Sequence, residues 1–111
     1  MANTFTRKLS RSIGTSLTSV GSYTVGASTQ TTVIGLSLAN ISNGSLTANV
    51  HLHSGGSNYQ LIKNAVVPFG GTLIPVGGDQ KLVLETNDSL CVSSSGPTDG
   101  VDVILSVLEI T

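Results

Sequence analysis

Hydrophobic and polar residues alternate from Gly21 to the end of the chain, and clusters of glycine, asparagine and aspartate interrupt the alternation. A period of two is typical of β-strands with one buried face, and such clusters mark the turns between strands. The pattern therefore predicts an all-β fold, a single antiparallel β-sandwich or jelly-roll-like domain of about eight strands. The predicted strands cover residues 23–25, 31–41, 46–53, 59–67, 72–76, 81–85, 89–93 and 101–110.

Two of the predicted strands, residues 31–41 and 101–110, are apolar on both faces. The outer face of an antiparallel sandwich normally meets water, so a second apolar face needs a cover. The cover is either a neighbouring subunit or the chain's own N-terminal segment. On the first alternative, we expect subunit contacts at Val33, Ile104 and Leu108. Within residues 31–41 the alternation assigns one face to Ile34, Leu36 and Leu38, and the other to Val33, Ala39 and Ile41.

The beginning of the chain is basic and does not continue the alternating pattern. We interpret residues 1–20 as an N-terminal arm and residues 21–111 as the sandwich domain. Phe5, Leu9 and Ile13 recur every four positions, which would align them on one face of a short helix. A flexible arm that orders against a partner is the preferred interpretation. The arm residues expected to bind this partner are Phe5, Arg7, Lys8, Leu9 and Arg11.

The chain carries few charges for a domain of 111 residues. Charged residues make up 10% of it, against about 25% in ordinary soluble domains, and the formal net charge is -1. A near-neutral surface favours association between molecules. We therefore expect a homo-oligomer, with a trimer as the first choice.

No residue pattern indicates a catalytic, cofactor or metal site. His51 and His53 would project from one face of a strand, but a zinc site needs further ligands and the chain has no other histidine. An exposed polar strand face is the preferred interpretation of this pair, and Cys91 is interpreted as a packed residue in an apolar run. The chain has no tryptophan and few other aromatic residues on which nucleic-acid bases could stack. We predict a non-enzymatic protein that binds no cofactor, nucleic acid or membrane.

Five motifs follow one another in a recognisable order: FTRKLSRSIGTSLTSVGSYTV, TTVIGLSLANIS, VVPFGGTL, KLVLETNDSLCV and VDVILSVLEI. Together they cover most of residues 5–110, and they resemble the small β-sandwich virion structural proteins of tailed phages, notably of myoviruses that infect marine cyanobacteria. Two positions depart from that pattern. Gly26 stands where proline is common, and Asn87 precedes Asp88 where glycine is common; the residues present are compatible with turns.

The resemblance implies a structural role in the virion, without catalytic residues and usually as a homo-oligomer, in a particle assembled in the host cytoplasm. We expect a capsid decoration (cement) protein whose arm binds the major capsid protein or another virion protein. One alternative is a protein of the neck, tail or fibres. Another, from a different class, is a carbohydrate- or host-surface-binding module that uses loops 54–58 or 95–100.

Overall fold

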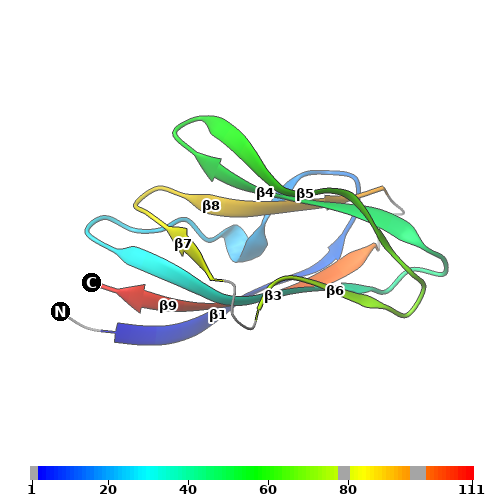
Figure 1. Cartoon of the computed structure of the whole chain (residues 1–111), viewed down its shortest axis with the longest axis horizontal. Coiled ribbons are helices and arrows are strands. Elements are labelled where there is room, and N and C mark those ends of the chain that lie inside the picture. The colour runs from blue at the N-terminus through cyan, green and yellow to red at the C-terminus, as the bar shows by residue number, and fades with distance from the viewer. Residues whose placement is uncertain (1–2, 78–80, 96–99) are drawn as a thin grey trace.

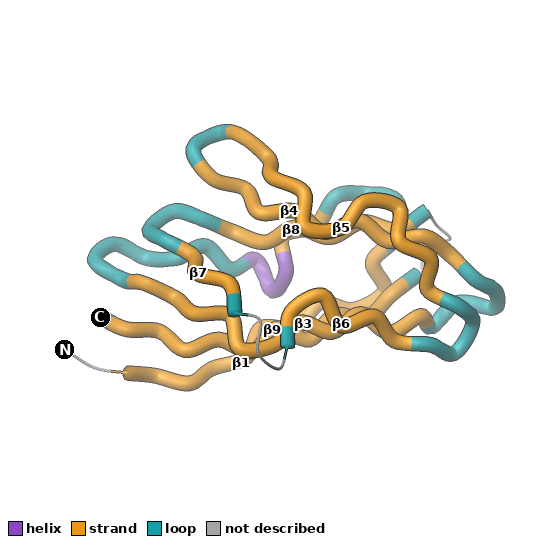
Figure 2. Tube along the Cα trace, viewed as in Figure 1, coloured by secondary structure: helices purple, strands orange, loops and turns teal. Residues whose placement is uncertain are grey.

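The computed structural model describes residues 3–77, 81–95 and 100–111, which form two antiparallel β-sheets packed face to face (Figure 1). The predicted all-β sandwich is confirmed. The 3-10 turn η1 (Val20–Ser22) lies between the two layers (Figure 2). The described residues contain no helix long and apolar enough to cross a membrane. The strands are β1 (Asn3–Ile13), β2 (Thr18–Ser19), β3 (Gln30–Asn40), β4 (Leu46–Ser54), β5 (Ser57–Val67), β6 (Thr72–Val76), β7 (Leu82–Leu84), β8 (Ser89–Ser94) and β9 (Val101–Ile110).

Strands distant in sequence lie side by side in each sheet. The five-stranded sheet has the order β1-β9-β3-β6, and β7 also pairs with β3. The four-stranded sheet has the order β2-β8-β4-β5. Because β1 and β9 are neighbours, Asn3 at the start of β1 lies beside Ile110 at the end of β9 (Figure 1). Pro75 lies in β6, at an edge of its sheet, where its missing N–H removes no ladder hydrogen bond.

One hydrophobic core fills the space between the sheets. Alternate residues of each long strand point inward, and the inner residues of β9 and β8 are almost completely buried. The hydrophobic residues among them are leucine and valine, whose branched side chains pack well on a pleated surface. The largest fully buried side chains are Leu36, Leu38, Leu84, Leu90, Leu105, Val20, Val25, Val33, Val50, Val67, Val76 and Val92.

A β-bulge in β3 changes which of its residues point inward. The register with β9 runs from Thr31↔Glu109 to Val33↔Val107 and then shifts, so that Gly35 pairs with Ser106 and Ile34 is the extra residue. An extra residue reverses the alternation beyond it. Val33 and Leu36 are therefore both buried, at 0% and 1% exposure. The prediction that Val33 contacts a neighbouring subunit was wrong, because it lies in the core.

Residues 3–13 form an edge strand of the sandwich, which differs from the predicted flexible arm. β1 pairs with β9 in continuous register from Asn3↔Ile110 to Ser10↔Val103. The register then shifts at Ser12, which has a φ of 56° and whose N–H donates to Asp102 Oδ1 at 2.9 Å. After this shift, the side chain of Ile13 is buried in the core. The helical alternative is therefore also wrong. The segment widens the five-stranded sheet and leaves the outer face of that sheet uncovered.

Residues 23–25 do not form the predicted strand, but Val25 is hydrogen-bonded through its backbone to residues 87 and 88. The N–H of Val25 donates to the carbonyl of Asp88, and the N–H of Asn87 donates to the carbonyl of Val25. Tyr23 is buried, and its hydroxyl lies 2.7 Å from Glu109 Oε2 and 2.8 Å from Thr31 Oγ1. Burial raises the pKa of Tyr23. This segment therefore closes one end of the sandwich although it is not a regular strand.

The side chain of Asn40 ties two turns together at the other end. Its Nδ2 donates to the carbonyls of Gly44 and Val67, both at 2.9 Å. Its Oδ1 accepts from the N–H and the hydroxyl of Ser42 at 2.9 and 2.7 Å. Asn40 is buried, so these bonds satisfy polar groups that water does not reach. The amide thereby fixes the β3–β4 turn against the end of β5.

Candidate interaction surface

The outer face of the five-stranded sheet carries exposed hydrophobic side chains from four of its strands. Phe5 is 74% exposed, Ile74 64% and Ile104 50%. Antiparallel sheets that face water normally place polar residues there. The exposed hydrophobic residues of this face are Phe5 and Leu9 from β1, Ile104 from β9, Ile74 from β6 and Val83 from β7.

The strand register arranges the side chains of this face in rows that run across the strands. Residues directly opposite each other in paired strands share a face and lie close together. Three rows are defined from the pairing of β1, β9, β3 and β7. The first apolar row is Phe5, Leu108, Thr32 and Val83; the small-residue row is Arg7, Ser106 and Gly35; the second apolar row is Leu9, Ile104 and Ser37.

Shallow depressions lie on both sides of Ser106. One, of about 340 Å³, is lined by Phe5, Arg7 and Ile34 together with Ser106. The other, of about 190 Å³, is lined by residues that include Gly35, Ser37, Ile74 and Ile104. The small-residue row is low at Ser106 and Gly35, because serine and glycine have little or no side chain. The long Arg7 side chain and Ile34 border this low part. The face is therefore ridged, with apolar rows on either side of a groove.

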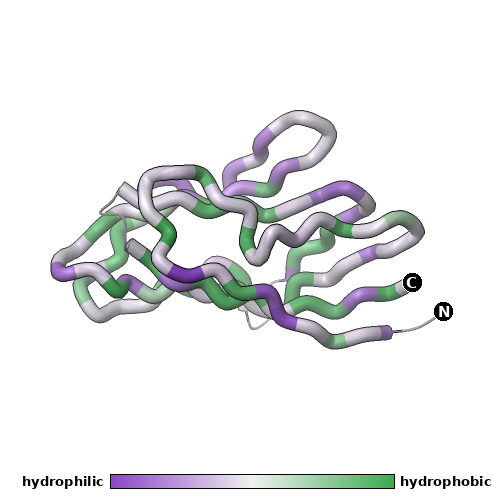
Figure 3. Tube along the Cα trace, turned by 180° about the vertical axis from the view of Figure 1, so that it is seen from behind, coloured by the Kyte–Doolittle hydropathy of each residue, from purple (hydrophilic) through white to green (hydrophobic). Residues whose placement is uncertain are grey.

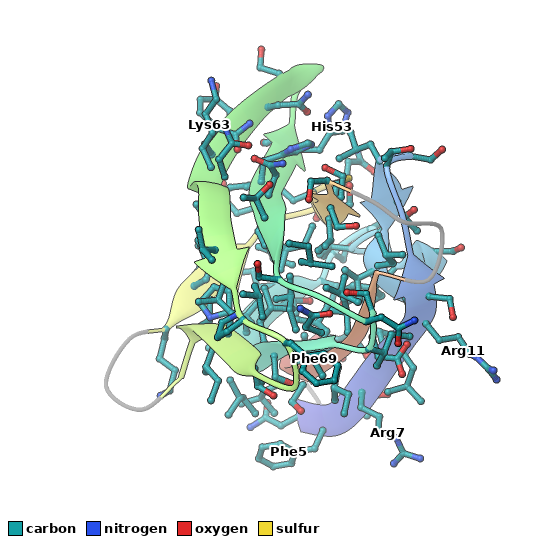
Figure 4. The ribbon with its side chains drawn as sticks, turned by 90° about the vertical axis from the view of Figure 1, so that its right-hand side faces the viewer. Phe5, Arg7, Arg11, His53, Lys63 and Phe69 are labelled. Atoms are coloured by element: carbon teal, nitrogen blue, oxygen red, sulfur yellow. The ribbon has the colours of Figure 1, made fainter. Side chains whose placement is uncertain are left out.

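The charges on this face are mainly basic and come from β1. Arg7 and Arg11 are exposed, and they alternate along the strand with Phe5 and Leu9. Figure 4 shows Phe5 and Arg7 on the side of the sandwich opposite Lys63 and His53. Four of the five predicted arm residues therefore share one exposed face.

Lys8, the fifth predicted arm residue, points to the other side of β1. Its ammonium lies 4.9 Å from the centroid of the Tyr23 ring, a distance at which a cation and an aromatic face attract each other. This contact is intramolecular. The position of Lys8 therefore does not support the prediction that it binds a partner together with its neighbours, because its ammonium group contacts the Tyr23 ring of the same chain.

The outer face of the four-stranded sheet has a different character. Figure 3 shows the hairpin of β4 and β5 largely in the white and purple of polar residues, whereas β1, at the label N, alternates between green and purple. Val66 in β5 is an exposed hydrophobic exception, at 67%. The residues whose register places them on this outer face include Thr47, Asn49, His51, His53, Gln60 and Ser93. The apolar outer face is thus a property of one sheet.

His51 and His53 share this face but have different surroundings. The His53 Nδ1 atom is hydrogen-bonded to Asn58 Oδ1 at 2.7 Å. His51 is 4% exposed, and its Nε2 atom is buried with no hydrogen-bond partner among the residues that the structure describes. Burial, and then the neighbouring charge of His53, lower the pKa of His51. The preferred interpretation of an exposed pair was wrong for His51.

Cys91 lies opposite His51 in the register of β8 with β4. It is a free, buried cysteine, as the sequence predicted, and burial raises the pKa of its thiol. The described residues contain no group of three or more His, Cys, Asp or Glu side chains placed to hold a metal ion.

The loops of the carbohydrate-binding alternative are only partly described. Residues 54–58 are the tip of the β4–β5 hairpin, a tight turn in which Gly55 and Gly56 have φ values of 59° and 81°. In the loop at 95–100, residues 96–99 lie outside the described residues.

Of the predicted subunit contacts, Ile104 and Leu108 lie on the apolar outer face, and Ile104 is half exposed. Ile74 and Val83 were not predicted, since each belongs to a short strand whose neighbour only the fold reveals.

No protein-family model and no curated protein sequence matches the chain.

Proposed function

We propose that this chain is a non-enzymatic structural protein of a tailed-phage virion, most specifically a capsid decoration protein. The observation that carries this proposal is the apolar outer face of the five-stranded sheet. Contiguous apolar surface on a small domain marks a contact with another molecule. The low content of charged residues, 10%, agrees with a surface that is largely covered in the working state.

The size of the apolar face favours a broad contact. Fully burying one large hydrophobic side chain contributes about 1.5–3 kcal/mol. Five such side chains on this face are at least half exposed, so covering all of them contributes roughly 4.5–9 kcal/mol. Association costs about 4–15 kcal/mol in lost translational and rotational freedom. A stable contact therefore has to cover most of the face, as a subunit held in a lattice does.

The winding of the chain supports the same proposal. The chain changes sheet at every step except from β4 to β5 and from β6 to β7. The sheet with the order β1-β9-β3-β6 therefore faces the sheet with the order β2-β8-β4-β5. We interpret this order as a jelly roll, with β6 and β7 as the two halves of one broken strand. Jelly rolls are the architecture of many viral capsid domains, and also of lectin domains. The fold alone does not choose between these functions, whereas a large apolar sheet face favours the structural role.

Four residues of β1 indicate which chemistry the proposed contact surface of the major capsid protein would need. Phe5 and Leu9 supply apolar surface, and Arg7 and Arg11 between them supply positive charge on the same face. A partner surface with apolar pockets and acidic side chains at this spacing would match. A partner in the neck, tail or fibres could offer the same chemistry.

Quantitative mass spectrometry of purified virions tests this proposal by counting the chain against the major capsid protein. A ratio near one, or one chain per few capsid subunits, supports the decoration role. A few copies per particle would move the protein to the neck, tail or fibres. Absence from the particles would refute the virion role.

A further inference from the structure

We propose that two copies of this chain pair through the outer faces of their five-stranded sheets. The two copies are related by a two-fold axis that lies in the interface between them and runs perpendicular to the strands. This inference rests on the proposed function only in treating that face as a contact surface. It concerns the free chain, because a chain that binds the capsid protein through this face cannot be paired through it at the same time. Its basis is that the ridges and the groove of the face are complementary to those of a second copy.

The spacing of the rows allows the two faces to interlock. Outward-pointing residues of a strand are two positions apart, so neighbouring rows are about 6.8 Å apart. A two-fold axis halfway between the small-residue row and the second apolar row exchanges these two rows. Ile104 of each copy then lies over Ser106 of the other, and each half-exposed isoleucine enters a depression of its partner.

The same axis keeps the arginines apart. It places Arg7 of one copy over Leu9 of the other, and Arg11 over Phe5. An arginine over a phenylalanine ring is a favourable cation–π arrangement, worth about 0.5–2 kcal/mol depending on its exposure. An axis parallel to the strands would instead place each apolar ridge on the same ridge of the second copy. Shape and charge therefore favour the axis across the strands.

The face is large enough for such a pair. Four strand positions at about 4.8 Å, over roughly ten residues at about 3.3 Å each, cover about 600 Å² before side-chain relief is counted. A standard stable interface buries about 600–1,000 Å² on each partner, so the face reaches the lower end of this range. Use of nearly the whole face therefore gives a contact of the required size. This pair has two-fold symmetry, so it replaces the trimer as the smallest assembly that we expect.

The test measures the mass of the full-length chain by sedimentation equilibrium up to high micromolar concentration. We expect a mass twice that of one chain. Ser106→Phe fills the groove that receives Ile104 and should weaken the pair at least roughly tenfold, about 1.4 kcal/mol. Val66→Glu is the matched control, because it changes an exposed β-branched residue on the other sheet and should leave the mass unchanged.

A compensating variant distinguishes this geometry from other ways of associating. In the double variant Ser106→Phe and Ile104→Ala, the new ring of each copy meets the space left by Ile104 of the other, so pairing should return. The single variant Ile104→Glu should abolish pairing while circular dichroism stays that of the wild type. A wild type that remains monomeric, a trimer, or loss of pairing in the double variant equal to that of Ser106→Phe would overturn the proposal.

The outcome is separable from that of the proposed function. A solution dimer with these variant effects, combined with absence from virions, would support the pairing and refute the virion role. A monomer in solution that is nevertheless abundant on virions would refute the pairing and support the virion role.

Discussion

Replacing Asn40 with alanine should be among the most damaging single changes in this fold. The amide makes four hydrogen bonds of 2.7–2.9 Å, two donated to the carbonyls of Gly44 and Val67 and two accepted from Ser42. A hydrogen bond contributes about 0.5–1.5 kcal/mol net, and a buried group left without a partner costs about 1–3 kcal/mol. The expected loss in the free energy of unfolding is therefore about 3–5 kcal/mol, a large part of the roughly 5–15 kcal/mol of a typical domain.

Urea unfolding of dilute protein, followed by circular dichroism, measures this loss. With a slope of about 1–3 kcal/mol per molar urea, the midpoint of Asn40→Ala should fall by roughly 1–5 M. Asn43→Ala changes an exposed asparagine in the same turn and should move the midpoint little. A loss below about 1 kcal/mol for Asn40→Ala, or one equal to that of the control, would show that the amide does not hold the two turns together.

Two further changes test the close approach of β1 to η1 and the buried histidine. Gly21 has a φ of 60°, and a Cβ added there would lie 2.7 Å from Lys8 Cβ, so Gly21→Ala should lower the free energy of unfolding in urea by at least about 1–2 kcal/mol. Gly44→Ala is the control and should lower it less, because no atom lies within 4 Å of a Cβ added at Gly44. Equal losses in the two variants would contradict the close packing of β1 against η1. Burial lowers the pKa of His51 from its usual 6.5, so below that pH the unfolded chain binds a proton that the folded chain excludes. The free energy of unfolding should therefore decrease as the pH falls below about 6.5 toward the pKa of the folded state. The loss is about 1.4 kcal/mol for each pH unit by which folding lowers the pKa. The drop in urea midpoint between pH 7.5 and 5.5 should be much smaller in His51→Gln than in the wild type. It should be only slightly smaller in His53→Gln, which removes the lesser cause of the lowered pKa of His51. Equal drops in all three proteins would refute the assignment.

The period of two in the sequence is sufficient to place most strands. Residues 72–76 and 101–110 were predicted with the bounds that the structure has. These signals are local, because alternation, Gly-Gly pairs and Asn turns act within a few residues. They could therefore be identified without knowledge of the strand order.

The errors arise where a spacing has two interpretations or a bulge changes the phase. Phe5 and Leu9 are four positions apart, which places them on one face of a helix and equally on one face of a strand. The alternating Thr4 and Thr6 were the local signal for a strand, since β-branched residues favour extended backbone. Val33 was assigned to the outer face because a strict alternation ignores the bulge at Ile34, and only pairing with β9 reveals that bulge.

The apolar outer face could be predicted only in part. Ile104 and Leu108 followed from the double-sided pattern of one strand. The ridge-and-groove relief depends on β1, β9 and β3 being neighbours in a defined register, which is information about contacts distant in sequence. Burial of His51 likewise depends on its neighbours in β5 and β8.

Hydroxyl-radical footprinting most directly tests whether the outer face of the five-stranded sheet is a contact surface. Oxidation of Phe5, Leu9 and Ile104 would be compared between dilute protein and the assembled state, either concentrated solution or purified particles. Tyr59 in β5 is 58% exposed and serves as the internal control. We predict that assembly protects Phe5, Leu9 and Ile104 and leaves Tyr59 unchanged. Equal oxidation of the three residues in dilute and assembled protein would contradict a contact through this face.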